Sequence, residues 1–334
     1  MTDILAPLSR DRLLEILGAM RNVQVAVVGD VMLDRYLIGD ADRVSPEAPV
    51  PVVTMESEVA VPGGAGNVAA NIAALGASAA LVAVVGEDSA GDALRETLVA
   101  LTVDTSGMLT IPGRPTTTKT RIVAQGQQIV RIDREVTNPV PDRHRDDLHA
   151  AAHLAIAEAD VVVVEDYDKG AIDAGFARAL VDSATEQGVP IVVDPKRRHF
   201  FDYAGATVFK PNRRELEAAF GTHFMGDDAD LAAARERLAV DHMLLTLGAD
   251  GMALISAGDA LRRTPSNARE VFDVSGAGDT VTAWLGAALG TGAEIGEAAW
   301  LANLAAGVKV GKRGTATVSP DEILQAWDET VGDK

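Results

Sequence analysis

The sequence predicts an α/β protein with a central, mostly parallel β-sheet covered by helices on both faces. Short apolar, β-branched runs, such as residues 23–28, 161–164 and 190–193, alternate with segments of helical pattern, such as residues 67–75 and 176–187. Neighbouring parallel strands need a helical crossover between them, and their residues are buried on both faces. The alternation therefore favours a doubly covered parallel sheet over a β-sandwich or a helical bundle.

In chain order, the expected strands of this sheet are residues 23–28, 80–85, 161–164, 190–193, 207–209 and 242–246. The expected helices between them include residues 67–75, 149–157, 176–187 and 213–220. Small or polar residues follow the strands, beginning with Gly29 and Asp30 after the first one. Open α/β sheets bind ligands at the carboxyl ends of their strands, so the functional site is expected there.

Two segments, residues 31–61 and 105–135, break the alternation. The first holds three prolines among valine-rich stretches, and the second contains an alternating apolar and polar run at residues 128–133. We expect short, partly exposed strands outside the main sheet. Such strands are suited to form a lid that excludes water from a reaction at the strand ends.

The composition excludes several functional classes. The chain has 334 residues, 47% of them hydrophobic, which is enough for a large core. A net charge of −19 argues against nucleic acid or an anionic membrane as a partner. The absence of cysteine rules out disulfides, zinc–thiolate sites and cysteine nucleophiles. No positively charged leader precedes an apolar run near Met1, so a cytoplasmic protein is expected.

The most informative motif is the run Asp-Val-Ser-Gly-Ala-Gly-Asp-Thr at residues 273–280. At a helix start, the backbone N–H groups of Gly276, Ala277 and Gly278 can converge on a phosphoryl oxygen. Asp279, in the first turn, is placed to accept a proton from an attacking hydroxyl. The alternative is a plain helix start with Ser275 as the cap, and the run alone does not decide between the two.

A second glycine-rich motif includes Gly63, Gly64 and Asn67. Glycine lets the backbone approach a ligand closely, and Asn67 and Asn71 share one helix face, where their amides can read sugar hydroxyls. An N-cap role for Asn67 is the simpler alternative. The spacing from Gly64 to Ala69 also matches the dinucleotide fingerprint of nicotinamide-dependent oxidoreductases, although a proline-containing segment precedes it instead of a strong strand.

Two carboxylates, Asp30 and Asp34, lie just beyond the first expected strand. A carboxylate has two acceptor oxygens and can clasp a vicinal diol of a sugar. Asp30 as a turn cap, and Asp34 paired with Arg35 or Arg43, are the competing interpretations.

Asn212 and Glu215 match a capping box at the start of a helix. Near a nucleotide, the same pair could orient phosphate and hydrated Mg²⁺. His149 and His153 stand four residues apart, but no acidic residue lies between them, so a metalloprotease site is not expected.

Taken together, four motifs resemble the ribokinase-like (PfkB) carbohydrate kinases across nearly the whole chain: residues 63–67, 212–215, 246–251 and 273–279. Within that family, residues 29–53, 166–170 and 193–196 are similar to the D-glycero-β-D-manno-heptose 7-phosphate kinases. The resemblance implies a ribokinase-like fold with a small β lid. It also implies phosphoryl transfer from MgATP to O1 of that sugar phosphate, in lipopolysaccharide inner-core biosynthesis. Another PfkB kinase, of the ribokinase, fructokinase or phosphofructokinase type, and a catalytically silent sugar-phosphate sensor remain alternatives.

By matching position, the resemblance implies that Asp279 is the catalytic base and that Gly276, Ala277 and Gly278 form the anion hole. It assigns the nucleotide to Lys196, Asn212, Arg213, Arg214, Glu215, Thr246, Gly248, Asn303 and Gly307, with Glu215 holding Mg²⁺ through water. It assigns the sugar to Asp30, Asp34, Gly63, Gly64 and Asn67. The distal phosphate needs cations, for which Arg131 and Lys169 are selected.

The expected organisation is one kinase domain over residues 1–334, with a lid formed from parts of 31–61 and 105–135. Many such kinases are fused to a nucleotidyltransferase, but no His-x-Gly-His motif occurs here, so that second domain is not expected. The expected partners are a sugar phosphate, ATP and a second copy of the chain that pairs through the lid.

Overall fold

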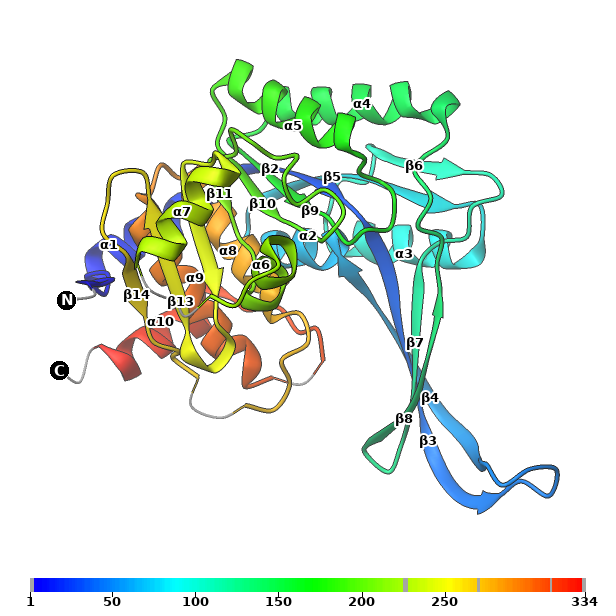
Figure 1. Ribbon diagram of the computed structural model, residues 1–334. Helices are drawn as coiled ribbons and strands as arrows, with labels where there is room; N and C mark the ends of the chain where they lie inside the picture. The colour runs from blue at the N-terminus through cyan, green and yellow to red at the C-terminus, as the bar shows by residue number, and fades with distance from the viewer. Residues whose placement is uncertain (1–2, 225–227, 269–270, 313, 332–334) are drawn as a thin grey trace.

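The computed structural model describes residues 3–224, 228–268, 271–312 and 314–331, and it has the predicted α/β architecture (Figure 1). The main sheet has the strand order β1-β14-β13-β12-β11-β10-β9-β2-β5-β6. All six expected strands are present in it, as β2 (Gln24–Gly29), β5 (Ser78–Gly86), β9 (Val161–Glu165), β10 (Ile191–Asp194), β11 (Val208–Phe209) and β12 (His242–Thr246). Each of these six runs parallel to its neighbours among them.

Four further strands of the main sheet were not expected: β1 (Asp3–Ile4), β6 (Met108–Ile111), β13 (Met252–Ser256) and β14 (Arg262–Thr264). β13 is antiparallel to both β12 and β14. β6 pairs parallel with β5, so residues 108–111 belong to the main sheet and not to the lid in which they were expected. The sequence signal fails there because a four-residue edge strand is too short to show burial on both faces.

Successive residues of the central strands face opposite sides of the sheet and create two hydrophobic cores. On one side, Val25 and Val27 pack with α1 (Arg10–Met20), α2 (Ala65–Ala74), α3 (Ser89–Ala100), α8 (Ala277–Gly290), α9 (Ile295–Val310) and α10 (Pro320–Thr330). On the other, Ala26 and Val28 pack with α4 (Asp142–Ala157), α5 (Ala174–Gln187), α6 (Arg213–Phe220) and α7 (Asp228–Leu238). None of the helices within the described ranges is long and apolar enough to cross a bilayer.

A second sheet stands apart from the body of the molecule (Figure 1). Its strand order is β4-β3-β7-β8, formed by β4 (Pro51–Gly64), β3 (Val31–Val44), β7 (Thr118–Ala124) and β8 (Gln127–Arg134). β3 and β4 are each 14 residues long and form a long antiparallel ribbon that extends well beyond the main sheet. Only Asp30 separates β2 from β3, and β4 runs directly into α2 at Gly64, so this lid sheet joins the main body at the carboxyl ends of its strands.

Candidate active site

Asp279 lies at the third position of α8, with its carboxylate held from two sides. Gly276, just before the helix, has a φ of 74°, a left-handed conformation that favours glycine. The Asn67 side-chain amide donates a hydrogen bond of 2.6 Å to Oδ2 of Asp279, and the Tyr167 hydroxyl donates one of 2.7 Å to Oδ1. Burial raises the pKa of Asp279, and these two hydrogen bonds lower it in part. The result is an oriented carboxylate with a raised proton affinity.

Asn67 is itself fixed by a second asparagine. Asn71, which is fully buried, donates to the Asn67 backbone carbonyl at 2.9 Å and to Asn67 Oδ1 at 3.2 Å. The two residues share one face of α2, as expected, but Asn71 supports Asn67 and does not read sugar hydroxyls. The Asn67 amide donates to Asp279 instead, because α2 packs against α8.

Of the three N–H donors expected in the anion hole, one already has a hydrogen-bond partner within the protein. The N–H of Ala277 donates to the Val274 carbonyl at 3.2 Å, because the left-handed Gly276 closes a tight turn there. Within the described residues, the N–H groups of Gly276 and Gly278 have no hydrogen-bond partner and remain available to an anion. They lie at the positive end of the α8 dipole, which also favours an anion.

A buried ion pair that the sequence did not predict stands close to the start of α8. Lys210 Nζ lies 2.9 Å from Asp194 Oδ2, and a Cβ placed on Gly278 would be 4.0 Å from Lys210 Nζ. Burial lowers the pKa of Lys210 and the Asp194 carboxylate raises it, with a net rise, so the ammonium stays charged. The carboxyl group of Glu165 is fully buried beside this pair, and burial raises its pKa well above the usual range.

A cavity of about 560 Å³ adjoins the first turns of α8. Five residues that the family resemblance assigned to the nucleotide line it: Asn212, Thr246, Gly248, Asn303 and Gly307. Ala277 and Gly278 also reach it, and its remaining walls are largely apolar, with Val271, Val281 and Val310 among them. Its size and mixed lining are typical of a small-molecule site.

Four other residues assigned to the nucleotide have different surroundings. Arg213 is exposed, with Nη2 3.6 Å from Asp250, and Arg214 faces a separate surface hollow, so neither lines the cavity. Both lie in the first turn of α6, and the capping geometry directs their side chains outward. Glu215 forms the expected capping box with Asn212, and its other oxygen accepts from Lys196.

The expected sugar-binding residues Asp34, Gly63 and Gly64 come together where the lid sheet meets α2. Asp34 Oδ1 accepts from Arg121 at 2.6 Å, so its ion-pair partner is neither Arg35 nor Arg43. Asp34 Oδ2 lies over Gly63, where an added Cβ would be only 2.4 Å away. Gly64 has a φ of 59° at the turn from β4 into α2. The dinucleotide fingerprint at this turn therefore follows an antiparallel lid strand, and not the parallel strand it requires.

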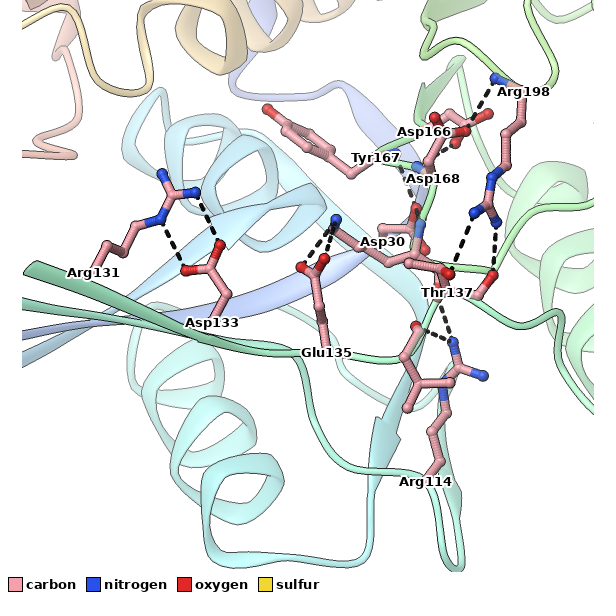
Figure 2. A network of polar contacts seen from close by, with 12 residues as sticks. Asp30, Arg114, Arg131, Asp133, Glu135, Thr137, Asp166, Tyr167, Asp168 and Arg198 are labelled. Carbon is pink, nitrogen blue, oxygen red and sulfur yellow. Dashed lines mark hydrogen bonds and ion pairs between the residues drawn. The ribbon is translucent and has the colours of Figure 1, made fainter.

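The structure gives Asp30 a role other than sugar binding. Its two carboxylate oxygens accept three backbone N–H groups, from Tyr167 at 2.9 Å, Lys169 at 2.8 Å and Ala171 at 3.0 Å. Figure 2 shows Asp30 beside Tyr167. The side chain is buried, and burial raises its pKa while the three hydrogen bonds lower it. Its oxygens already have these partners, so Asp30 holds the loop at residues 167–171 that presents Tyr167 to the base.

The two cations expected to bind a distal phosphate are both paired. Arg131 makes a two-pronged contact with Asp133, at 2.8 and 2.9 Å, and Lys169 Nζ lies 2.9 Å from Glu135 (Figure 2). The sequence assigns no role to Tyr167, which lies within residues 166–170. Its position two residues after the end of β9 is the one signal by which the sequence marks it.

Comparisons with known proteins identify the family and the fold. The profile described as pfkB family carbohydrate kinase matches residues 22–322. Proteins named bifunctional protein HldE, from Paramagnetospirillum magneticum and Acidiphilium cryptum, are each 44% identical to this chain, over 96% and 95% of it. The chain spans about two thirds of their length, 67% and 66% respectively.

Solved structures share the fold at lower identity. Arabidopsis thaliana ribokinase, complexed with ribose and ATP, is 21% identical, with a TM-score of 0.72 over 91% of this chain and 98% of that one. Phosphofructokinase-2 from Escherichia coli, in complex with potassium, is 20% identical, with a TM-score of 0.75 over 92% and 99% of the two chains. The fold is therefore ribokinase-like.

Proposed function

Because this chain belongs to the pfkB family of carbohydrate kinases, we propose that it phosphorylates O1 of D-glycero-β-D-manno-heptose 7-phosphate. The kinase class is a phosphotransferase with an alcohol group as acceptor. The observation that carries the proposal is the buried carboxylate of Asp279, which lies between a nucleotide-sized cavity and the cluster at Asp34 and Gly63. The choice of heptose 7-phosphate rests on the resemblance of residues 29–53.

In this mechanism, Asp279 accepts the proton of the sugar O1 hydroxyl as that oxygen bonds to the γ-phosphorus of ATP, and the bond from that phosphorus to the bridging oxygen breaks to release ADP. Asn67 holds Oδ2 of the base, and Tyr167 hydrogen-bonds Oδ1. A general base contributes roughly 10²–10⁴-fold, and positioning and charge stabilisation supply most of the remainder. The anomeric hydroxyl is more acidic than an ordinary alcohol, so a carboxylate is a sufficient base.

The negative charge of the transferred group falls at the start of α8. The free N–H groups of Gly276 and Gly278 and the ammonium of Lys210 are the donors available to it. Preorganised donors of this kind stabilise the charge that develops in the transition state.

The residues present fit ATP and Mg²⁺. The cavity takes a nucleotide with the base among Val271, Val281 and Val310 and the phosphates toward Gly278. In the described ranges, no three histidine or acidic side chains gather to hold an ion directly. Mg²⁺ keeps several waters and binds substrate phosphates, so contact through water with Glu215 suits this donor set. When bound, the ion neutralises charge on the β- and γ-phosphates.

We also propose a homodimer that pairs through the lid, in the cytoplasm, where ATP and sugar phosphates are available. Apolar side chains on the lid ribbon are exposed, including Met55 at 59%, Val59 at 46% and Ile132 at 55%. Light scattering of the wild type and of Met55→Lys tests this pairing. A monomeric wild type would reject it.

Replacement of Asp279 by Asn tests the kinase mechanism. The variant keeps the size of the side chain and one of its two acceptor atoms but cannot accept the proton, so ADP release with heptose 7-phosphate should be lost while MgATP still raises the Tm. Retention of most of the turnover would reject Asp279 as the base. A wild type that binds the sugar phosphate but never transfers phosphate would be the silent sensor.

A sugar panel separates the kinase alternatives. Preference for ribose, fructose 6-phosphate or a nucleoside over heptose 7-phosphate would reject the proposed substrate and retain the kinase. Stabilisation by NAD but not by MgATP would instead favour an oxidoreductase.

A further inference from the structure

One lysine of the lid sheet faces the active site and has no carboxylate partner among the described residues. The strand register places Asp34 of β3, Lys119 of β7 and Asp133 of β8 in one row across the sheet, with their side chains on the same face. Asp34 contacts Gly63 on this face, and Lys119 Nζ lies 5.7 Å from the centroid of the Tyr167 ring. This row therefore faces the base.

The neighbouring cations are all matched by carboxylates. Arg121 lies 2.6 Å from Asp34, and Arg131 and Lys169 bind Asp133 and Glu135 respectively. Within the part of the chain that the structure describes, no carboxylate lies in ion-pair range of Lys119 Nζ. Its two acidic neighbours in the row, Asp34 and Asp133, each already form an ion pair with an arginine.

The surroundings of Lys119 favour an added anion. Burial lowers the pKa of Lys119, Asp34 raises it, and the nearby charges of Lys169 and Arg131 lower it again. A partly buried ammonium beside two other cations is costly until a negative group compensates it. Such perturbed, uncompensated charges are typical of functional sites.

The distance from Lys119 to the base suits a sugar phosphate. Tyr167 connects the two, with its ring 5.7 Å from Lys119 Nζ and its hydroxyl 2.7 Å from Asp279 Oδ1. With the length of a phenol, these contacts limit the Nζ to Oδ1 distance to about 11 Å. A seven-carbon sugar in pyranose form places its terminal phosphorus roughly 8 Å from O1, which is shorter than this limit. With a hydrogen bond of about 2.8 Å at each end, the sugar phosphate fits between the base and Lys119 when these three segments form an angle and are not collinear.

We propose that Lys119 binds the phosphate group of the acceptor sugar and so determines the preference of this kinase for a phosphorylated substrate. The inference rests on the proposed function, in which the acceptor carries a distal phosphate. The phosphate supplies the counter-charge that Lys119 lacks, while Arg131 and Lys169 keep their own carboxylates.

The test compares wild type, Lys119→Gln and Lys119→Arg on heptose 7-phosphate and on the same heptose without its phosphate. A charge-assisted hydrogen bond predicts a 10- to 100-fold lower kcat/KM for Lys119→Gln with the phosphorylated sugar, mostly through KM. The KM for ATP and the kcat/KM for the unphosphorylated heptose should stay within about twofold of wild type, and Lys119→Arg should recover part of the loss. Arg35→Gln is the matched control, because Arg35 is a paired cation on the outer face of β3.

Each outcome has a separate meaning. Equal losses on both sugars, or no loss on either, would overturn the role of Lys119 even if heptose 7-phosphate is the substrate. A wild type that uses another phosphorylated sugar would reject only the heptose. The loss of kcat/KM in Lys119→Gln, compared between that sugar with and without its phosphate, would still decide the role of Lys119. A wild type that prefers sugars without phosphate would reject both proposals.

Discussion

Replacement of Tyr167 by Phe isolates one hydrogen bond to the catalytic carboxylate. The ring keeps its contacts with Lys119 and Lys196, and only the donor at 2.7 Å from Asp279 Oδ1 is lost. A hydrogen bond to a charged group contributes about 1.5–3 kcal/mol, and 1.36 kcal/mol corresponds to one pKa unit. Because the lost bond stabilises the ionised form, the pKa of Asp279 should rise by about one to two units.

The assay is the pH profile of kcat/KM for the sugar, which reports the free enzyme. The acidic limb should move to higher pH by about one to two units, with activity largely recovered above it. Tyr203→Phe is the matched control, because the Tyr203 hydroxyl also donates to a buried carboxylate, Asp166 at 2.9 Å, away from the base. An acidic limb that does not move in Tyr167→Phe, or that moves equally in Tyr203→Phe, would refute the reasoning.

Three further predictions concern buried groups near the site. The Asp166 pKa is raised to about 6, chiefly by burial, so its contribution to stability is complete below about pH 4 and is lost as the pH rises through 6. Between pH 4 and 7 this loss lowers the free energy of unfolding by about 3 kcal/mol, and Asp166→Asn should remove that part of the pH dependence in urea titrations. An unchanged pH dependence of the free energy of unfolding would contradict the prediction. Gly63→Ala places a Cβ 2.4 Å from Asp34 Oδ2, so the KM for the sugar should rise more than about tenfold while the KM for ATP stays nearly constant. Equal rises in both KM values would argue against a sugar-specific site. Glu165→Gln keeps the shape of a carboxyl group whose pKa is raised well above its usual range. At pH 7 the free energy of unfolding should therefore stay within about 1 kcal/mol of wild type. A loss above about 3 kcal/mol would show that the charged form is required.

The sequence predicted the central strands well because a strand buried on both faces is an uninterrupted run of apolar residues. Residues 161–164 are four consecutive valines, and the structure buries all of them completely. β14 has only three residues, two of them arginines, and so shows no apolar run; its place in the sheet depends on pairing with β1 and β13.

The site was predictable where its chemistry lies within one short motif. The run from Gly276 to Asp279 combines a left-handed turn, a helix start and a carboxylate, all readable from neighbouring residues. The hydrogen bond from Tyr167 joins positions 112 residues apart, and no local pattern records it. Asp30 shows the same limit, because an aspartate after a strand looks alike in sequence whether it binds a sugar or three backbone N–H groups.

The continuity of β4 with α2 has a mechanical consequence. The lid ribbon passes into the helix at Gly64, and Asn67, three residues later, is the group that aims Asp279. The turn where the sugar is expected and the side chain that orients the base thus belong to one continuous segment, residues 63–67. A displacement of the ribbon at Gly64 would therefore act within one helical turn of the group that holds the carboxylate.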